Sequence, residues 1–453
     1  MSTEPLPFHL RGNFAPVMNE LDERNLVVEG AVPPELTGLF VRNGANPSTG
    51  RSPHWFLGDG MVHGVRIENG RAAWYRNRYV KTPSLADALA PRISELGVID
   101  HVNSKANTHI LRHAGKILAL EEGSFPYELD SELDTLGPCT FGAGGDSGIN
   151  TAFTAHPHVC PETGELIAFG YGQLPPYLVY YRISAEGKVL QREEIDVPGP
   201  TMVHDFMISR KYTIFMDLPV VFDLQAALRG TMPFHWSDDY GARIGLMPRE
   251  GTNAEVRWFD VDPCYVFHAV NAWDAIEDGS EKVYFDVCRM SEIWREAGDM
   301  TMANSVNSLH RFEFDLTLGT VRESTIDDRS MDFPRIDDRR VGLQNRYAYT
   351  LQASNKETGD DGGHLKFDLQ TGGSERHEYG AGMIPGEPVF VAANDTDVNS
   401  DSGWVMNYVY DEKSAKSELQ IVDASCFTAA PVARIKLPER VPFGFHGSWI
   451  ADE

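Results

Sequence analysis

The feature that most constrains the fold of this chain is a series of short apolar runs, each bounded by turn-forming residues. Gly, Asp, Asn or Pro flanks each run, and the runs are rich in β-branched and aromatic residues. Their length and composition are typical of strands rather than helices. The clearest runs are KILALEEG (116–123), ELIAFGYG (165–172), YLVYYRI (177–183), KYTIFMD (211–217), KVYFDVC (282–288) and RYAYTLQ (346–352).

A weak internal repeat groups these strands into units. HRFEFDLTLGTVRE (310–323) and HLKFDLQTGGSERHE (364–378) share a strand, a glycine turn and a polar return strand, and residues 417–437 have a similar outline. Residues 178–195 read as a hairpin around Glu-Gly-Lys. Repeated four-stranded units that close radially make a β-propeller, and seven blades of roughly 60 residues would account for the length. Two stacked β-sandwiches are the alternative.

Helical signals are few. The best candidate is SLADALAPRISEL (84–96), which would begin at Ser84 as N-cap and is interrupted by Pro91. No linker-like Ser/Gly/Pro tract divides the chain, and the polar stretch 354–364 is too short to be a linker, so it is predicted to be an exposed loop. One all-β domain over residues 1–453 is therefore expected.

The charge of the chain excludes some classes of partner. With 66 acidic and 40 basic side chains, the net charge is −26, which opposes binding to nucleic acid or anionic lipid. The N-terminus does not resemble a signal peptide, and no run of about 18 apolar residues is present. Five scattered cysteines without a CxxC pair are typical of reduced, buried thiols. Together these features predict a cytoplasmic protein.

Four of the fifteen histidines stand out. Each follows small or apolar residues in a strand or at a strand end, and they lie far apart in the chain: His156, His204, His268 and His446. Histidines contributed by separate blades are what a metal on a propeller axis needs, whereas hydrogen-bonded core histidines are the alternative. His63 is expected to be structural, and His158 a pocket or surface residue. Surface or local hydrogen-bonding roles are expected for His9, His54, His101, His109, His113, His235, His310, His364 and His377.

Sequence blocks spread along the whole chain match one known family. They are NFAPV (13–17), LVVEGAVPPELTGLFVRNGANP (26–47), HWFLGDGMVHG (54–64), YRNRYVKT (75–82), ANTHILRHAGKILALEEG (106–123), AHPHVCPETGEL (155–166), VHDF (203–206), FHAVNAW (267–273), DFPRID (332–337), GEPVFV (386–391) and GFHGSW (444–449). In order and spacing they resemble the carotenoid cleavage oxygenases, which include lignostilbene- and isoeugenol-cleaving enzymes. The resemblance implies a seven-bladed β-propeller in which short helices and loops cap the active-site face. It also implies a non-haem Fe(2+) held by His156, His204, His268 and His446.

The same resemblance implies supporting residues around the iron. Carboxylates fix and orient ligand imidazoles, and the family's positions for them fall on Glu122, Asp332 and Glu387. The family generally carries Glu where this chain has Asp332, so the shorter side chain must approach its histidine more closely or reach it through water. Thr108 matches a family threonine near the O2 site, and an ordinary strand threonine is the alternative.

The activity implied by the resemblance is cleavage of a C=C bond by O2 into two carbonyl products. The alkene supplies the electrons, and the sequence contains no credible GxGxxG unit or P-loop. Phenol-cleaving members typically carry Lys before the first carboxylate, together with a nearby Tyr. Here that position is Glu121, which would repel a phenolate, and residues 93–107 contain no Tyr.

The expected substrate is therefore a small, apolar, conjugated alkene of the carotenoid or apocarotenoid class. A stilbenoid or phenylpropanoid alkene, a non-cleaving isomerase or hydrolase, and a non-catalytic propeller are the alternatives. The one candidate membrane patch, residues 85–99, is modest and carries charges, so at most weak peripheral contact with a membrane is expected. The sequence indicates no oligomeric state.

Overall fold

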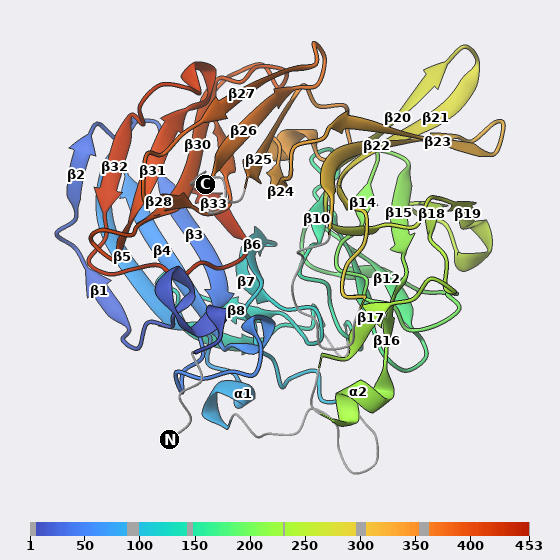
Figure 1. Cartoon of the computed structure of the whole chain (residues 1–453), viewed down its shortest axis with the longest axis horizontal. Helices are drawn as coiled ribbons and strands as arrows, with labels where there is room; N and C mark the ends of the chain where they lie inside the picture. Colours follow the sequence, from blue (N-terminus) through green and yellow to red (C-terminus); the bar gives the residue numbers. More distant parts are fainter. Residues whose placement is uncertain are drawn as a thin grey trace. The chain divides into compact units, whose positions relative to one another are not determined.

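Regular structure in this protein is almost entirely β-strand. The structure, a computed structural model, describes residues 6–87, 99–142, 148–229, 232–295, 305–352 and 362–452. Within them, α-helix is limited to α1 (Pro83–Ala86) and α2 (Leu224–Leu228) (Figure 1). The described strands form seven sheets of four to six strands and one two-stranded sheet. The prediction of an all-β, seven-bladed propeller with few short helices is confirmed.

The chain divides into two compact units. Unit 1 comprises Met1–Thr140, Tyr349–Lys366 and Ser374–Glu453, and unit 2 comprises Phe141–Ala348 and Phe367–Gly373. The prediction of one domain over residues 1–453 stays a prediction. One of the four-stranded sheets has the strand order β24 (Asp332–Arg335), β25 (Tyr347–Gln352), β26 (Gly363–Asp368) and β27 (Gly373–His377).

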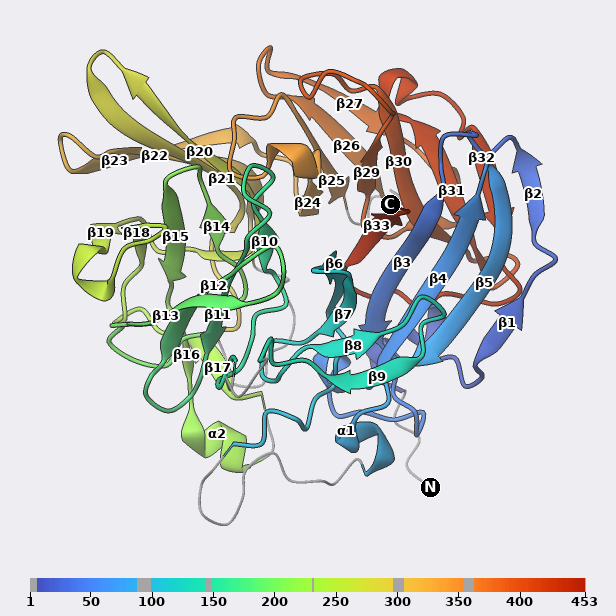
Figure 2. The ribbon, with the colours of Figure 1, turned by 180° about the vertical axis from the view of Figure 1, so that it is seen from behind.

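Unit 1 contains three sheets, two of which join strands from both ends of the chain. The first has the order β1 (Leu21–Glu23), β5 (Arg71–Tyr79), β4 (Gly60–Glu68), β3 (Gly38–Ala45) and β33 (Gly447–Ala451). The second is β2 (Val27–Gly30), β32 (Ala433–Lys436), β31 (Lys416–Asp423), β30 (Gly403–Asp411) and β28 (Met383–Pro385), with β29 (Val389–Ala392) also on β30. The third is β6 (His109–His113), β7 (Lys116–Leu120), β8 (Tyr127–Leu129) and β9 (Thr135–Pro138). Figure 2 shows β33 alongside β3.

Unit 2 contains three four-stranded sheets and a short hairpin. The first sheet has the order β10 (His158–Val159), β11 (Leu166–Tyr171), β12 (Leu178–Ile183) and β13 (Val189–Ile195). The second has the order β14 (Met207–Ile208), β15 (Tyr212–Asp217), β18 (Arg243–Pro248) and β19 (Arg257–Asp260). The third has the order β20 (Tyr265–Glu277), β21 (Ser280–Met290), β22 (Asn307–Asp315) and β23 (Thr320–Asp327). The hairpin pairs β16 (Val220–Phe222) with β17 (Phe234–Trp236). All six strands predicted from the apolar runs are present, and so is the hairpin predicted over residues 178–195.

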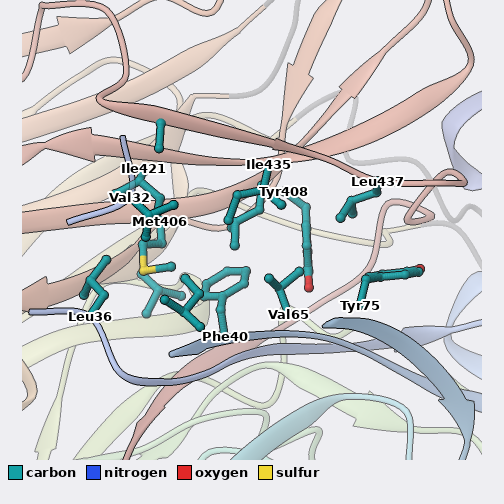
Figure 3. Close-up of a cluster of buried hydrophobic side chains, with 14 of the residues drawn as sticks. Val32, Leu36, Phe40, Val65, Tyr75, Met406, Tyr408, Ile421, Ile435 and Leu437 are labelled. Carbon is teal, nitrogen blue, oxygen red and sulfur yellow. The ribbon is translucent and has the colours of Figure 1, made fainter. Parts of the chain in front are cut away.

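One hydrophobic core of unit 1 lies between its two larger sheets. Aliphatic and aromatic side chains from β3–β5 meet those from β29–β32 (Figure 3), with Phe40 and Tyr408 packed edge to face at 5.0 Å between ring centroids. Fully burying a side chain of this size contributes about 1.5–3 kcal/mol. A layer of this kind fixes the strand register, since a one-residue slip would turn every apolar side chain outward.

Three local predictions need correction. The helix begins two residues earlier than expected, because Thr82, not Ser84, caps it by accepting from the Leu85 N–H, and it already ends at Ala86. Its predicted continuation over 88–96 lies outside the described residues. The predicted loop at 354–364 is described only from residue 362, and its end already belongs to β26. Cys426 is exposed, whereas the other four free thiols are buried as expected. No helix in the described residues has the length and apolar character to cross a membrane.

Candidate metal centre

Three of the singled-out histidines converge within unit 2. His156 lies just before β10, His204 just before β14 and His268 within β20. Their candidate ligand nitrogens all lie within 4.8 Å of one another. His204 is the central member, with its Nε2 3.1 Å from Nε2 of His156 and 3.3 Å from Nε2 of His268. Three residues far apart in sequence thus present the same ring atom to one small region.

Asp332 orients one of these rings. Nδ1–H of His268 donates to Oδ1 of Asp332 at 2.7 Å, so the lone pair of the neutral ring lies on Nε2, the atom facing His204. The shorter carboxylate therefore contacts its histidine directly and needs no bridging water. The same oxygen accepts the Phe333 N–H at 2.9 Å, and Phe333 has a left-handed backbone with φ of 52°. The Phe333 ring packs on His268 at 5.1 Å.

The donor set fits a divalent transition metal. Because the neutral ring of His268 presents a lone pair on Nε2, an unprotonated Nε2 of His204 places a second lone pair 3.3 Å from it. A shared cation relieves that repulsion. Neutral imidazoles suit iron, copper, zinc and nickel, and a supporting carboxylate behind a ligand histidine is the usual arrangement at such sites.

His446, in unit 1, is built in the same way as His268. It lies immediately before β33, is 4% exposed, and donates from Nδ1 to Oε1 of Glu387 at 2.9 Å. The second carboxylate oxygen of Glu387 accepts the Gly447 N–H at 2.7 Å. The carboxylate thus clamps both the ring and the backbone beside it, and the ring presents its Nε2 lone pair.

Thr108 contacts the backbone of His446. Its carbonyl oxygen accepts the His446 N–H at 3.0 Å, and its hydroxyl donates to Oδ1 of Asn107 at 2.9 Å. Glu122 lies in unit 1, two residues beyond the end of β7, and is half-buried. The roles expected for Thr108 and Glu122 stay predictions.

A buried carboxylate that the sequence reasoning missed ties two of the histidines together. Asp205 follows His204 directly, is 2% exposed, and accepts the Ala269 N–H at 2.8 Å through Oδ2. Its Oδ1 accepts the Phe206 N–H at 2.7 Å. Because Ala269 follows His268, Asp205 fixes the backbone beside both rings. The sequence block VHDF (203–206) includes Asp205, but an Asp beside a His does not by itself predict a contact with the backbone of Ala269.

The histidines assigned to other roles have other partners. Nε2 of His158 lies 2.9 Å from the carbonyl oxygen of Phe206, to which it is placed to donate, as expected for a residue that is not a ligand. His63 is buried against the Tyr75 hydroxyl at 2.9 Å, and desolvation sets its pKa well below the usual range. His364 and His377 are buried, and their side chains contact the backbone carbonyls of Gly386 and Phe427.

The carboxylate of Glu121 organises a loop of unit 1. Oε2 accepts the Lys105 N–H at 2.7 Å and the hydroxyls of Ser104 and Ser124 at 3.1 Å each, and Oε1 accepts the Gly123 N–H at 3.1 Å. These four groups lie within hydrogen-bonding distance of the carboxylate, and the two serine hydroxyls also contact each other at 2.5 Å. The position where phenol-cleaving relatives typically carry Lys is thus filled by a hydrogen-bonded anion.

The contact between Asp332 and His268 leads to a first prediction. Asp332→Asn is expected to weaken binding of a divalent metal by about 10- to 100-fold, because an amide supports the imidazole N–H less strongly than a carboxylate. Titration with Co(2+), followed by visible absorption, measures this affinity. Asp328→Asn changes an exposed acid nearby and should bind like the wild type. Equal affinity in wild type and Asp332→Asn would contradict the supporting role.

Comparison with known proteins places these residues in context. A family model described as Retinal pigment epithelial membrane protein matches residues 14–451. A carotenoid cleavage oxygenase of Mycobacterium tuberculosis is 37% identical, over 97% of each chain. A carotenoid 9,10(9',10')-cleavage dioxygenase 1 of Pisum sativum is 34% identical, over 99% of this chain and 91% of the relative. The crystal structure of a lignostilbene dioxygenase of Pseudomonas brassicacearum matches 99% of this chain and 100% of its own, with a TM-score of 0.87 and 30% identity. An apocarotenoid oxygenase variant of Synechocystis matches 97% of this chain and 98% of its own, with a TM-score of 0.85 and 26% identity.

Proposed function

The chain belongs to the carotenoid cleavage oxygenase family, and from that premise we propose that it is a non-haem Fe(2+) dioxygenase that splits a C=C bond of an apocarotenoid with O2. The observation that carries the proposal is the convergence of His156, His204 and His268, with the ring of His268 oriented by Asp332. The names of the relatives, which are oxygenases and dioxygenases, favour iron among the metals that such a donor set accepts.

We infer that His446 supplies a fourth ligand. Its support is chemical likeness, since His268 and His446 each direct Nδ1–H to a carboxylate and so present Nε2. Four neutral imidazoles add no negative charge to the cation. The carboxylates of Asp332 and Glu387, together with Glu122 as expected from the family, would then offset that charge from outside the ligand set.

Bound Fe(2+) would supply a centre at which O2 reacts with an electron-rich alkene, whose double bond provides the electrons that the reaction needs. The residues of the chain have positioning roles. Asp332 and Glu387 orient the imidazole rings of His268 and His446. Asp205, which follows His204, accepts from the backbone N–H of Ala269, which follows His268. The ring of Phe333 packs on that of His268, with 5.1 Å between the ring centroids. Thr108 is placed by its backbone contact with His446 and is proposed to affect the approach of O2.

The substrate class is proposed from the surroundings of Glu121. The carboxylate of Glu121, which is held by hydrogen bonds from neighbouring groups, would repel a phenolate because both carry negative charge. A polyene without a phenol has no such charge and is not repelled. The likeness to the lignostilbene dioxygenase favours a stilbenoid alkene as the second candidate. A shorter, partly water-soluble apocarotenoid also suits a chain of charge −26 and the proposed cytoplasmic location.

A substrate panel tests the proposal. Fe(2+)-loaded protein is offered an apocarotenal, resveratrol and isoeugenol in parallel under 18O2, and the carbonyl products are identified by mass. We expect cleavage of the apocarotenal, with one labelled oxygen atom in each product. Metal-free protein treated identically is the control.

Each other outcome of the panel rejects a defined part of the proposal. Cleavage of the phenolic substrates alone would replace the substrate class by the second candidate. Conversion without oxygen consumption would indicate an isomerase or hydrolase. No conversion of any substrate by protein that binds iron would contradict the dioxygenase assignment.

A further inference from the structure

A chain of three hydrogen bonds runs through unit 1 and ends beside Glu387. Nδ2 of Asn407 in β30 donates to the Tyr379 hydroxyl at 2.8 Å. The hydroxyl lies 2.7 Å from Nδ1 of His364 in β26. Nε2 of His364 lies 2.8 Å from the carbonyl oxygen of Gly386, the residue before Glu387.

The chemistry of the groups fixes the direction of every bond. A carbonyl oxygen only accepts, so Nε2 of His364 must carry the proton, and Nδ1 must then accept from Tyr379. The Tyr379 oxygen in turn accepts from Asn407. His364 and Asn407 are fully buried, and desolvation lowers the pKa of His364 to about 3, so its ring stays neutral. Burial raises the pKa of Tyr379, so its hydroxyl keeps the proton that it donates.

The chain acts on a backbone segment that is also held from its other side. The Gly386 N–H donates to the carbonyl oxygen of Tyr408 at 2.9 Å, while the Gly386 carbonyl accepts from His364. Both peptide groups of this residue are therefore fixed. Glu387, the next residue, accepts from Nδ1 of His446 and from the Gly447 N–H. The position of Glu387 is thus linked to Tyr379 and His364 through a single residue.

We propose that His364 and Tyr379 are positioning residues for the metal ligand His446, acting through the Gly386 carbonyl and the carboxylate of Glu387. The inference rests on the proposed function, since it takes His446 as a ligand. The chain touches neither substrate nor metal, so its effect should appear in metal affinity. Outer-sphere partners of metal ligands typically affect affinity by about 10- to 100-fold, and a contact one step further out should affect it less.

Tyr379→Phe tests the inference by removing one hydroxyl. We expect the Co(2+) affinity of the full chain to fall by about 3- to 10-fold, with a changed visible absorption of the bound Co(2+). Tyr75→Phe is the matched control, because it removes the hydroxyl of another buried Tyr–His pair in the same unit, that of Tyr75 and His63 at 2.9 Å. It should lower the melting temperature to a similar extent while leaving Co(2+) affinity unchanged.

Two further comparisons separate positioning from general stability. His364→Gln retains an amide donor for the Gly386 carbonyl and should keep more Co(2+) affinity than His364→Leu. In a Glu387→Gln background, Tyr379→Phe should have no further effect on affinity, because the carboxylate through which it acts is gone.

Several results would overturn the inference. They are unchanged Co(2+) affinity in Tyr379→Phe, an equal loss of affinity in Tyr75→Phe, or an undiminished effect of Tyr379→Phe beside Glu387→Gln. A wild-type protein that fails to bind one equivalent of Co(2+) or Fe(2+) would instead reject the proposed metal site itself, and the inference with it.

Discussion

His204→Ala is expected to abolish stoichiometric iron binding and to lower the cleavage rate by more than about 100-fold, which exceeds the usual effect of changing an outer-sphere partner. The reason is its central place, since Nε2 of His204 lies 3.1 Å and 3.3 Å from Nε2 of His156 and His268. Iron content after reconstitution measures the first effect, and product formation measures the second. His235→Ala is the matched control, since His235 lies in the β16–β17 hairpin and belongs to no candidate ligand set.

A thermal readout makes the same test independent of substrate. A metal that binds only the folded state raises its stability in proportion to the logarithm of the metal concentration above Kd. The melting temperature of the wild type and of His235→Ala should therefore rise with added Co(2+), whereas that of His204→Ala should not. A full metal-dependent rise in His204→Ala would show that His204 is not a ligand.

The second large effect concerns stability. Asp286→Ala is expected to lower the free energy of unfolding by about 1.5–3 kcal/mol, the typical contribution of hydrogen bonds to a charged group, because the side chain of Arg311 is only partly buried. Asp286 in β21 is fully buried and accepts from Nε and Nη2 of Arg311, both at 2.7 Å, from the facing position of β22. Without it, the guanidinium of Arg311, which lies over the Trp273 ring at 4.9 Å, would keep an uncompensated charge.

Urea denaturation measures this loss against an exposed pair of similar geometry. Glu162 and Arg210 also form a two-point contact in unit 2, at 2.7 and 2.8 Å, but both side chains are exposed. Glu162→Ala should cost less than about 1 kcal/mol, because solvent screens the pair. Equal losses in the two variants would contradict the claim that burial gives the Asp286–Arg311 pair its importance.

Much of the fold was readable from the sequence because strand signals are local. Runs such as 166–171 and 178–183 carry their own apolar and aromatic pattern, and turn residues separate them. The blade count came from the chain length at roughly 60 residues per blade, and the family resemblance implied the same number. The helix start was misplaced because Pro83 and Thr82 compete with Ser84 for the first turn, and only the backbone decides between them.

The four candidate histidines stood out by their sequence context, and the family resemblance implied their role as ligands and three supporting carboxylates. Of these, Asp332 and Glu387 contact His268 and His446, whereas the role of Glu122 stays a prediction. Two details depend on tertiary structure and have no sequence signal. Asp332 reaches His268 directly beside the left-handed backbone of Phe333, and Asp205 bridges to Ala269 across 64 positions of sequence. Likewise, a histidine in a polar stretch, His364, proved to be fully buried.

The pairing of β33 with β3 has a consequence for biosynthesis. Arg42 faces Gly447 in this pair, so this sheet stays incomplete until residues 447–451 have been synthesised. Contacts between such distant segments form slowly, and an unpaired edge is exposed in the meantime. Since His446 immediately precedes β33, a chain truncated before residue 446 would lack both the strand that completes this sheet and the proposed fourth ligand.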